Sequence, residues 1–366
     1  MTDARVRVLS DGSAGRTAPK AAALAASLRR AEGFAAVTPE DIEALPVRGL
    51  QHRLYRVRGI RREGAGVLLR VPRQSHWGLP PADNLDYQAE SFRRARLSEA
   101  VPRLFAILAP SAELPWGALA VEEIVGHAPR LPEEAPALCD ALLAIHMLAV
   151  PEARAPLIDQ LDPLAAMLAT IENQARALEG AGLSVGARRQ IEEELAWAQA
   201  YGAEHANSRQ FRTLIMTDTQ PGNFVVDARG RARCVDLEKA VYGTPAIDLA
   251  HATIYPSGMW DPAVAWSPED ADIAAFYRRY LAHAPEIHAR ELRRVLAPFR
   301  RLTWLRTITI FARMAAAARK RDWSGFELEP AFRNHALAHI ADCHDEERLR
   351  EMRGEWLDRG GLDALL

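Results

Sequence analysis

Two short apolar segments decide how this sequence is interpreted, and each carries polar or acidic residues. The first is Leu214-Ile215-Met216-Thr217-Asp218-Thr219-Gln220-Pro221-Gly222-Asn223-Phe224-Val225-Val226, and the second is Arg233-Cys234-Val235-Asp236-Leu237-Glu238. Short apolar runs separated by Pro and Gly are typical of buried strands joined by a loop. We therefore expect Asp218 on a loop that follows a strand, with Asn223 at the start of the next strand.

Asp218, Asn223 and Asp236 follow one another in the order that a phosphoryl-transfer site requires. Such a site uses a carboxylate to deprotonate the acceptor hydroxyl, then an Asn and a second Asp to hold Mg²⁺ against the ATP phosphates. Asp236 has apolar neighbours, where an unpaired carboxylate is costly, and Mg²⁺ would satisfy it. The alternatives are a turn former at Asp218 and a solvent-facing strand end at Asp236. Glu238 shares a strand face with Asp236, so either a contact with the metal or acceptor or a solvated position is expected.

The composition indicates an ordinary globular protein. The chain has 366 residues, of which 49% are apolar and 26% charged, and a net charge of -2. This balance argues against a nucleic-acid partner, and the length suits two lobes. Three separated cysteines predict neither a disulfide framework nor a zinc site. Because we find no signal-peptide core and no uncharged run of about 18 residues, we expect no membrane partner and a cytoplasmic location.

The pattern along the chain predicts three parts. Residues 1–36 read as an N-terminal extension with one helix, and residues 37–124 as a lobe of short strands around one main helix. Residues 125–366 are mainly helical, with a strand-rich insert at 213–241. The elements expected in the first two parts are a helix at 19–32, a hairpin at 53–58 and 67–71, a helix at 85–98, and strands at 104–108 and 118–124.

The motifs together resemble those of the aminoglycoside phosphotransferase and choline kinase-like superfamily, whose fold is similar to that of protein kinases. Residues 218–227 resemble its D-x-x-P-G-N motif, residues 235–238 its D-F-E motif, and residues 242–250 its G-x-P and D-L-A motifs. The resemblance covers roughly residues 40 to 320. It implies a two-lobed α+β fold, with an antiparallel sheet and one main helix in a small N-terminal lobe and a larger, mostly helical C-terminal lobe.

The same resemblance assigns roles to individual residues. It makes Asp218 the catalytic base, Asn223 and Asp236 the Mg²⁺ ligands, and Asp248 a structural carboxylate that braces the catalytic loop. The implied activity is transfer of the γ-phosphate of ATP to a hydroxyl of a small molecule such as an amino-sugar, sugar or amino-alcohol. ATP and Mg²⁺ are the expected cofactors, and the oligomeric state stays open.

The first lobe would supply the nucleotide contacts. Residues 49–55 resemble the family's phosphate-covering turn, with a plain strand entry as the alternative. Arg70 falls where the fold places a phosphate-binding Lys, and Glu90 would be its ion-pair partner. An exposed strand Arg and an exposed helix Glu are the alternative. The segment that contains Glu122 and Ile124 resembles the one whose backbone hydrogen-bonds the adenine.

The acceptor is expected to bind the part that follows the motifs, residues 255–272, which carry Trp260, Trp266 and several carboxylates. Aromatic faces and carboxylates suit a cationic or sugar-like acceptor. Trp304 lies on a further helix that could line the pocket, as a similar helix does in choline kinase-like proteins. Its spacing with Ile308 and Phe311 equally predicts core packing.

Two positions depart from the family pattern. Met216 stands where the family usually has His, and Gln220 replaces the His of the common His-Pro-Gly-Asn run. Met216 cannot hydrogen-bond like imidazole, so apolar packing or other groups must hold the loop. His146 is expected to pack in the core. Met216 and the absent first-lobe lysine keep a nucleotide-binding regulatory protein, with little transfer activity, as the alternative function.

Overall fold

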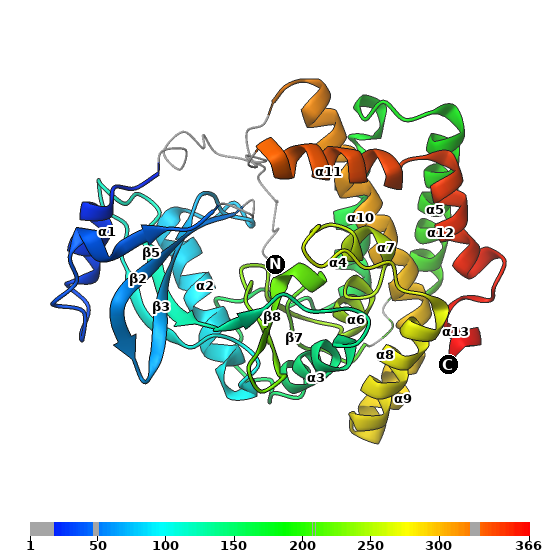
Figure 1. Ribbon diagram of the computed structural model, residues 1–366. Helices are drawn as coiled ribbons and strands as arrows, with labels where there is room; N and C mark the ends of the chain where they lie inside the picture. The colour runs from blue at the N-terminus through cyan, green and yellow to red at the C-terminus, as the bar shows by residue number, and fades with distance from the viewer. Residues whose placement is uncertain (1–17, 47–50, 207, 209, 323–329) are drawn as a thin grey trace.

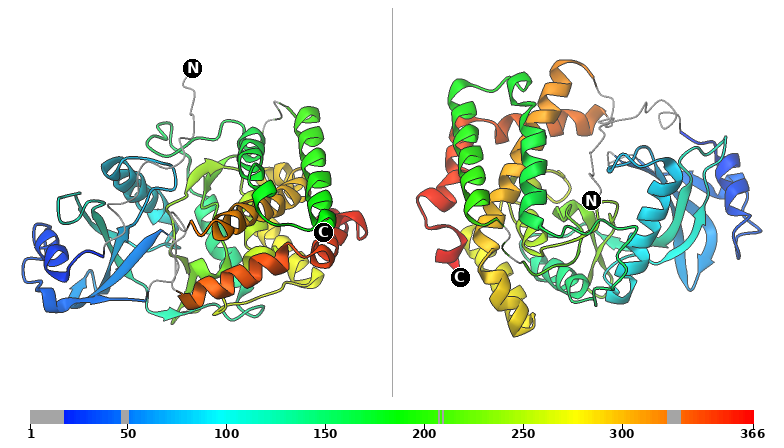
Figure 2. Two further views of the ribbon diagram at one scale, coloured as in Figure 1. Left: turned by 90° about the horizontal axis from the view of Figure 1, so that it is seen from above. Right: turned by 180° about the vertical axis from the view of Figure 1, so that it is seen from behind.

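The computed structural model describes residues 18–46, 51–206, 208, 210–322 and 330–366. The first lobe contains an antiparallel five-stranded sheet with the strand order β1-β2-β3-β5-β4 (Figure 1). Its strands are β1 (Ile42–Ala44), β2 (His52–Arg62), β3 (Ala65–Pro72), β4 (Leu104–Leu108) and β5 (Ala118–Glu123). The described residues that follow β5 form a larger, mainly helical lobe on the other side of the molecule (Figures 1 and 2).

Helices cover the two faces of this sheet. Val67 and Leu69 of β3 are buried in one cluster with Leu24 of α1 (Ala21–Leu28) and Phe34. Because side chains alternate along a strand, Arg70 points to the opposite face. There its guanidinium lies 5.8 Å from the ring of Phe92, on α2 (Pro81–Ala95). The N-terminal extension therefore shares one apolar core with the sheet, and α2 lies on the face that carries Arg70.

The larger lobe holds two small sheets that carry the motif residues. One has the strand order β6-β8-β9, and in the other β10 pairs with β7. The strands are β6 (Gly126–His127), β7 (Thr213–Ile215), β8 (Phe224–Asp227), β9 (Ala232–Cys234) and β10 (Val241–Gly243). The turn between β8 and β9 contains Gly230 at a φ of 73°, a left-handed conformation that favours glycine.

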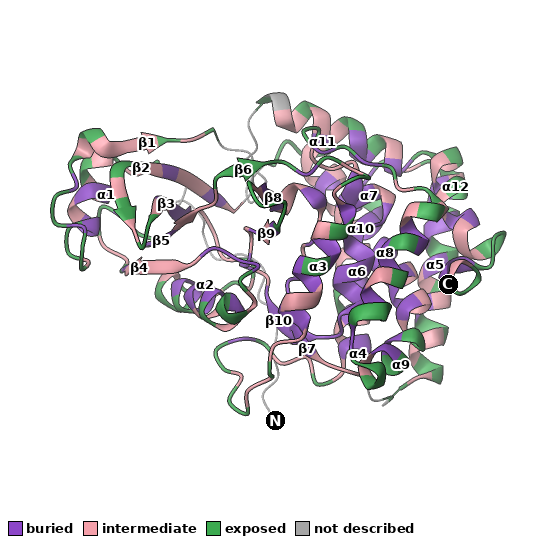
Figure 3. Ribbon diagram, turned by 60° about the horizontal axis from the view of Figure 1, so that its bottom comes forward, coloured by how far each residue is buried: buried purple, intermediate pink, exposed green. Residues whose placement is uncertain are grey.

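Helices make up the remainder of this lobe. Residues of α6 are all buried, and α10 packs against α4, α6 and α11 (Figure 3). The helices are α3 (Ala135–His146), α4 (Pro163–Ala175), α5 (Val185–Glu204), α6 (Ala246–His251), α7 (Tyr255–Gly258), α8 (Asp270–His283), α9 (Glu286–Arg293), α10 (Leu296–Arg319), α11 (Pro330–Cys343), α12 (Glu346–Leu357) and α13 (Gly361–Leu365). Short 3-10 segments occur at η2 (Pro39–Asp41), η3 (Arg96–Ser98), η4 (Leu178–Gly180) and η5 (Pro221–Asn223).

The α+β fold with a small sheet-containing lobe and a larger helical lobe is confirmed. The expected hairpin and the helix at 85–98 are present as β2, β3, α2 and η3. Gly49 and Leu50 of the expected phosphate-covering turn lie outside the described residues, and the division of the chain at residues 36 and 124 remains a prediction. Within the described ranges, every helix is too short or too polar to span a bilayer.

Candidate active site

Asp248 holds the loop that carries Asp218. The loop starts where β7 ends, and the backbone N–H groups of Met216 and Thr217 donate to the two carboxylate oxygens of Asp248 at 2.7 Å each. Nε2 of His146 donates to the same carboxylate at 3.0 Å. Asp248 is fully buried, so these three donors compensate its lost hydration. Asp218 is thereby presented from a fixed backbone.

The backbone at Thr217 is in an uncommon conformation. Its φ is 61°, a left-handed value that is costly for a β-branched residue. Three hydrogen bonds hold it there: the N–H donates to Asp248, the hydroxyl donates to the carbonyl of Lys239 at 3.0 Å, and the carbonyl accepts from Arg306 at 2.9 Å. Strain of this kind immediately before Asp218 is characteristic of functional loops.

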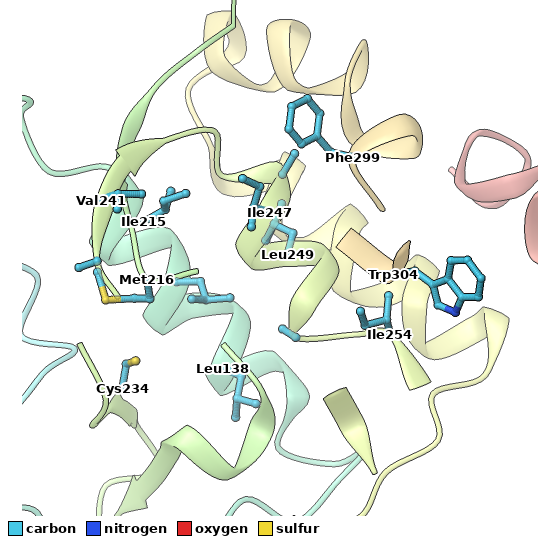
Figure 4. Packing of buried hydrophobic residues seen from close by; sticks show 14 of the residues in the cluster. Leu138, Ile215, Met216, Cys234, Val241, Ile247, Leu249, Ile254, Phe299 and Trp304 are labelled. Carbon is cyan, nitrogen blue, oxygen red and sulfur yellow. The ribbon is translucent and has the colours of Figure 1, made fainter. Parts of the chain in front are cut away.

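Met216 and His146 both support the loop that carries Asp218, one by packing and the other by hydrogen bonding. Met216 is buried in an apolar cluster with Ile215 and Val241 (Figure 4), so its side chain packs while its backbone binds Asp248. His146 is also buried, but its ring links Asp248 to the hydroxyl of Tyr280, which lies 2.9 Å from Nδ1. An imidazole thus reaches the loop from α3, in a role beyond the core packing that we expected.

Lys239 forms an ion pair with Asp218. The distance from Nζ to Oδ2 is 2.5 Å, and Nδ1 of His251 lies 3.9 Å from the other carboxylate oxygen. Burial alone would raise the pKa of Asp218, but the charges of Lys239 and His251 outweigh it and hold that pKa well below its usual value. The motifs assign no role to Lys239, although it directly follows the D-x-E run and is one of only three lysines.

Asn223 and Asp236 are brought together by the backbone. The amide nitrogen of Asn223 donates to the carbonyl of Asp218 at 2.8 Å, which leaves the side-chain oxygen for other ligands. The carbonyl of Asn223 accepts from the N–H of Val235 at 2.9 Å, next to Asp236. The structure therefore places all three motif residues in one region.

The donor set around Asp236 fits Mg²⁺. Ligand atoms of His52, Asp236 and Glu238 lie within 4.8 Å of one another. One carboxylate oxygen of Glu238 is buried with no hydrogen-bond partner among the described residues. Burial and the nearby charge of Asp236 raise the pKa of Glu238. An oxygen-rich site with an unsatisfied carboxylate oxygen matches the preference of Mg²⁺.

Arg70, on β3 of the first lobe, binds Asp236 of the larger lobe. Its guanidinium donates to Oδ1 of Asp236 at 2.5 Å and to the carbonyl of Val235 at 2.7 Å. The expected ion pair between Arg70 and Glu90 is wrong, since Glu90 accepts from Arg94 at 2.6 Å.

The position of Glu90 around α2 explains why it does not pair with Arg70. Gln88 is the buried α2 residue that faces the site, and its Oε1 lies 2.9 Å from Nε2 of His52. Glu90 is two residues further on, which turns it about 200° around the helix. His52 in turn places Nδ1 2.9 Å from Glu238, so a second contact joins the lobes.

The segment expected to hydrogen-bond the adenine contains Glu122 and Ile124, and the N–H of Glu122 is already bonded within the protein. The N–H of Glu122 donates to the carbonyl of Arg103 at 2.8 Å, and its carboxylate binds the side chain of the same arginine at 3.0 Å. The N–H of Glu122 is therefore engaged within the protein, and a contact of its carbonyl with the adenine stays a prediction. Ile124 lies in the link between β5 and β6, where the lobes join, and an adenine contact there stays a prediction.

The two candidate acceptor tryptophans lie in different surroundings. Trp304 is 2% exposed, and its indole N–H donates to the sulfur of Met352 at 3.3 Å, so the expected acceptor contact is wrong and the packing alternative holds (Figure 4). Trp260 is partly buried and stacks on Phe311 at 5.4 Å. Its neighbour Asp261 lies so close to the catalytic loop that a Cβ on Gly222 would come within 2.8 Å of it.

Comparison with solved structures places this geometry in a known fold. Ethanolamine kinase from Plasmodium vivax matches with a TM-score of 0.53 at 14% identity, over 85% of this chain and 84% of that one. Choline kinase from Cryptosporidium parvum matches with a TM-score of 0.54 at 12% identity, over 93% and 98%. An aminoglycoside phosphotransferase solved with AMP-PNP and hygromycin B gives 0.52 at 17%, over 87% and 98%.

Sequence comparison supplies the family. A search of curated proteins gives no match. The model of the phosphotransferase enzyme family matches residues 41–299, which include β2, β3, the Asp218 loop, Asp236 and Asp248. Because this match spans well over half of the sequence, the chain belongs to the phosphotransferase enzyme family.

Proposed function

We propose that this small-molecule kinase transfers the γ-phosphoryl group of ATP to a hydroxyl of a small molecule, with Asp218 as the base. The observation that carries the proposal is the loop geometry: Asp248 fixes the backbone before Asp218, and Asn223 binds the backbone of Asp218 itself. In the proposed step the acceptor oxygen bonds phosphorus as the bond to ADP breaks, and Asp218 takes the hydroxyl proton.

Asn223 and Asp236 would hold Mg²⁺, and the unsatisfied oxygen of Glu238 is a third available ligand atom. The ion would neutralise charge on the phosphates of the nucleotide. Arg70 would bind those phosphates. Its buried Nε has no partner among the described residues, so the guanidinium has a donor to spare while it holds Asp236. Arginine suits this position because its fork binds phosphate oxygens bidentately.

A nucleotide-binding regulatory protein remains the second candidate. The observation that favours it is that cations already neutralise both key carboxylates, Lys239 at Asp218 and Arg70 at Asp236. In a catalytic cycle these pairs must open or share their partners with substrate. A regulatory protein would keep them closed.

Titration calorimetry with ATP, with and without Mg²⁺, separates the candidates when it is followed by turnover assays on amines, amino-alcohols, sugars and hydroxy acids. The kinase proposal expects Mg²⁺-dependent binding that weakens in Asp236→Ala, and ADP formation that depends on an acceptor. Asp363→Asn, an exposed carboxylate on α13, is the matched control. ATP binding without turnover of any acceptor would favour the regulatory protein.

A further inference from the structure

Two arginines of α10 lie beside the catalytic loop. Arg306 donates to the carbonyl of Thr217 at 2.9 Å, one residue before Asp218. Arg313 follows seven residues later, which puts it on the same helix face about 10 Å along the axis. In the part of the chain that the structure describes, neither arginine forms an ion pair with a carboxylate. Their charges are therefore available to a ligand.

The exposed side chain of His76 lies near both arginines and near the base. It belongs to the segment between β3 and α2, and it lies within electrostatic range of Asp218, Lys239, Arg306 and Arg313. Lys239 and Arg306 lie next to the Asp218 loop, and Arg313 extends the positive charge along α10 toward His76. The side of the base reached by α10 is therefore rich in positive charge.

The carboxylates expected to bind a cationic acceptor are used elsewhere. Glu269 and Asp272 form the capping box of α8, and Asp270 lies 3.3 Å from Arg359. Asp261 is the acidic group that stays near the loop, beside Gly222, and one of its oxygens accepts the N–H of Ala263 at 2.9 Å. The carboxylates expected to bind a cation are thus largely engaged, whereas Arg306 and Arg313 have no ion-pair partner among the described residues.

We propose that the acceptor is an anionic small molecule, a hydroxyl compound that also bears a carboxylate or phosphate group held by Arg306 and Arg313. This inference rests on the proposed kinase function and names its substrate class. Guanidinium groups bind both kinds of anion through paired, charge-assisted hydrogen bonds. The anionic group would bind toward α10 while the hydroxyl lies against Asp218.

A binding experiment tests the anion site without knowledge of the natural acceptor. Thermal unfolding of the Mg·AMP-PNP-saturated protein is followed in sodium sulfate and in sodium chloride of equal ionic strength. We expect sulfate at tenfold its Kd to raise Tm by about 2 °C. The rise should be absent in Arg306→Gln and Arg313→Gln, and unchanged in Arg290→Gln, an exposed arginine of α9. No rise in the wild type, or an equal rise in all four proteins, overturns the proposal.

Arg313→Gln keeps this test informative if Arg306→Gln unfolds, because Arg313 makes no hydrogen bond or ion pair to any residue in the described ranges. Failure of Mg·AMP-PNP to bind would overturn the kinase function itself. Nucleotide binding without a sulfate effect would overturn only the anionic acceptor.

A kinetic experiment then compares acceptors that share one diol skeleton: glycerate, glycerol 3-phosphate, glycerol and 3-aminopropane-1,2-diol. We expect kcat/KM for the better anion to exceed that for glycerol by about tenfold or more, as one charge-assisted hydrogen bond provides. Arg313→Gln should remove this preference and leave KM for ATP unchanged. Glycerate against glycerol 3-phosphate distinguishes carboxylate from phosphate. Equal or better turnover of the amine contradicts the proposal.

Discussion

Nζ of Lys239 lies 2.5 Å from Oδ2 of Asp218, so the proposed base is held as a carboxylate by a cation that comes from the segment after Asp236. The same segment reaches back to the catalytic loop, because the carbonyl of Lys239 accepts from the hydroxyl of Thr217. The base and the proposed metal ligand are thus linked through one short stretch of chain. This coupling explains how three residues separated in sequence come to lie in one region.

Lys239→Met should lower kcat by about a hundredfold, because the partly buried carboxylate of Asp218 loses its ion-pair partner and its fixed orientation. Steady-state kinetics with saturating Mg·ATP measure this loss. Lys320→Met, which removes an exposed lysine at the end of α10, is the control and should keep wild-type kcat. Wild-type kcat in Lys239→Met would show that the ion pair has no part in turnover.

Asp248→Asn should destabilise the protein by about 3 kcal/mol, because an amide has a single acceptor oxygen for N–H groups that now bind two oxygens. Urea unfolding measures the free energy. Activity should fall together with stability, since the Asp218 loop loses its support. Asp363→Asn should change the free energy of unfolding by less than about 0.5 kcal/mol. Equal stability of the two variants would contradict the bracing role.

Acidification should destabilise the fold through His251. Burial, only partly offset by Asp218, lowers its pKa from 6.5 to about 4 in the folded protein. The unfolded chain therefore binds a proton between these two values while the folded protein does not, so stability falls as the pH drops from about 6.5 toward 4. The loss assigned to His251 is at most about 3 kcal/mol.

Urea unfolding at pH 7.5 and pH 5 measures this loss. His251→Gln should reduce the difference between the two pH values, and His283→Gln, an exposed histidine of α8, should leave it as in the wild type. An unchanged pH dependence in His251→Gln would show that other buried groups account for the effect.

Trp260 and Trp304 should respond differently to truncation. Trp304→Ala should cost about 4 kcal/mol of stability, because it empties a buried site between Met352 and Trp356. Trp260→Ala should cost less stability and raise KM for the acceptor, since Trp260 directly precedes Asp261, which lies beside Gly222 of the catalytic loop. Denaturant unfolding and acceptor KM together separate the two. A raised acceptor KM in a folded Trp304→Phe variant would restore Trp304 to the acceptor site.

The sequence predicted those features that depend on neighbouring residues. The spacing of Asp218, Asn223 and Asp236 is local, and the structure places all three on short connected strands and loops. Partners that are distant in sequence could not be predicted in the same way. Arg70 binds Asp236 across 166 positions, whereas the family resemblance implied Glu90 on the following helix as its partner.

Helix geometry explains why Trp304 and the carboxylates at 269–272 do not lie in the expected acceptor site. Trp304 has the spacing of a core residue, and nothing local distinguishes core from pocket on a helix with apolar residues on several sides. The acidic residues at 269–272 looked like a cation site, but Glu269 and Asp272 cap the N-terminus of α8 and Asp270 pairs with Arg359. The place of Lys239 after the D-x-E run marked it for attention, but its contact with Asp218, 21 positions away, forms only in the folded chain.

The assignment of Asp218 as the base is tested most directly by one measurement: phosphoryl transfer from Mg·ATP to the best acceptor by Asp218→Asn, with the Kd for Mg·ATP determined on the same protein. The nearly isosteric amide keeps the size of the side chain but accepts no proton. We expect kcat to fall by about a thousandfold while the Kd for Mg·ATP stays within about twofold of the wild type. A kcat close to that of the wild type in a folded, nucleotide-binding Asp218→Asn protein would contradict the account.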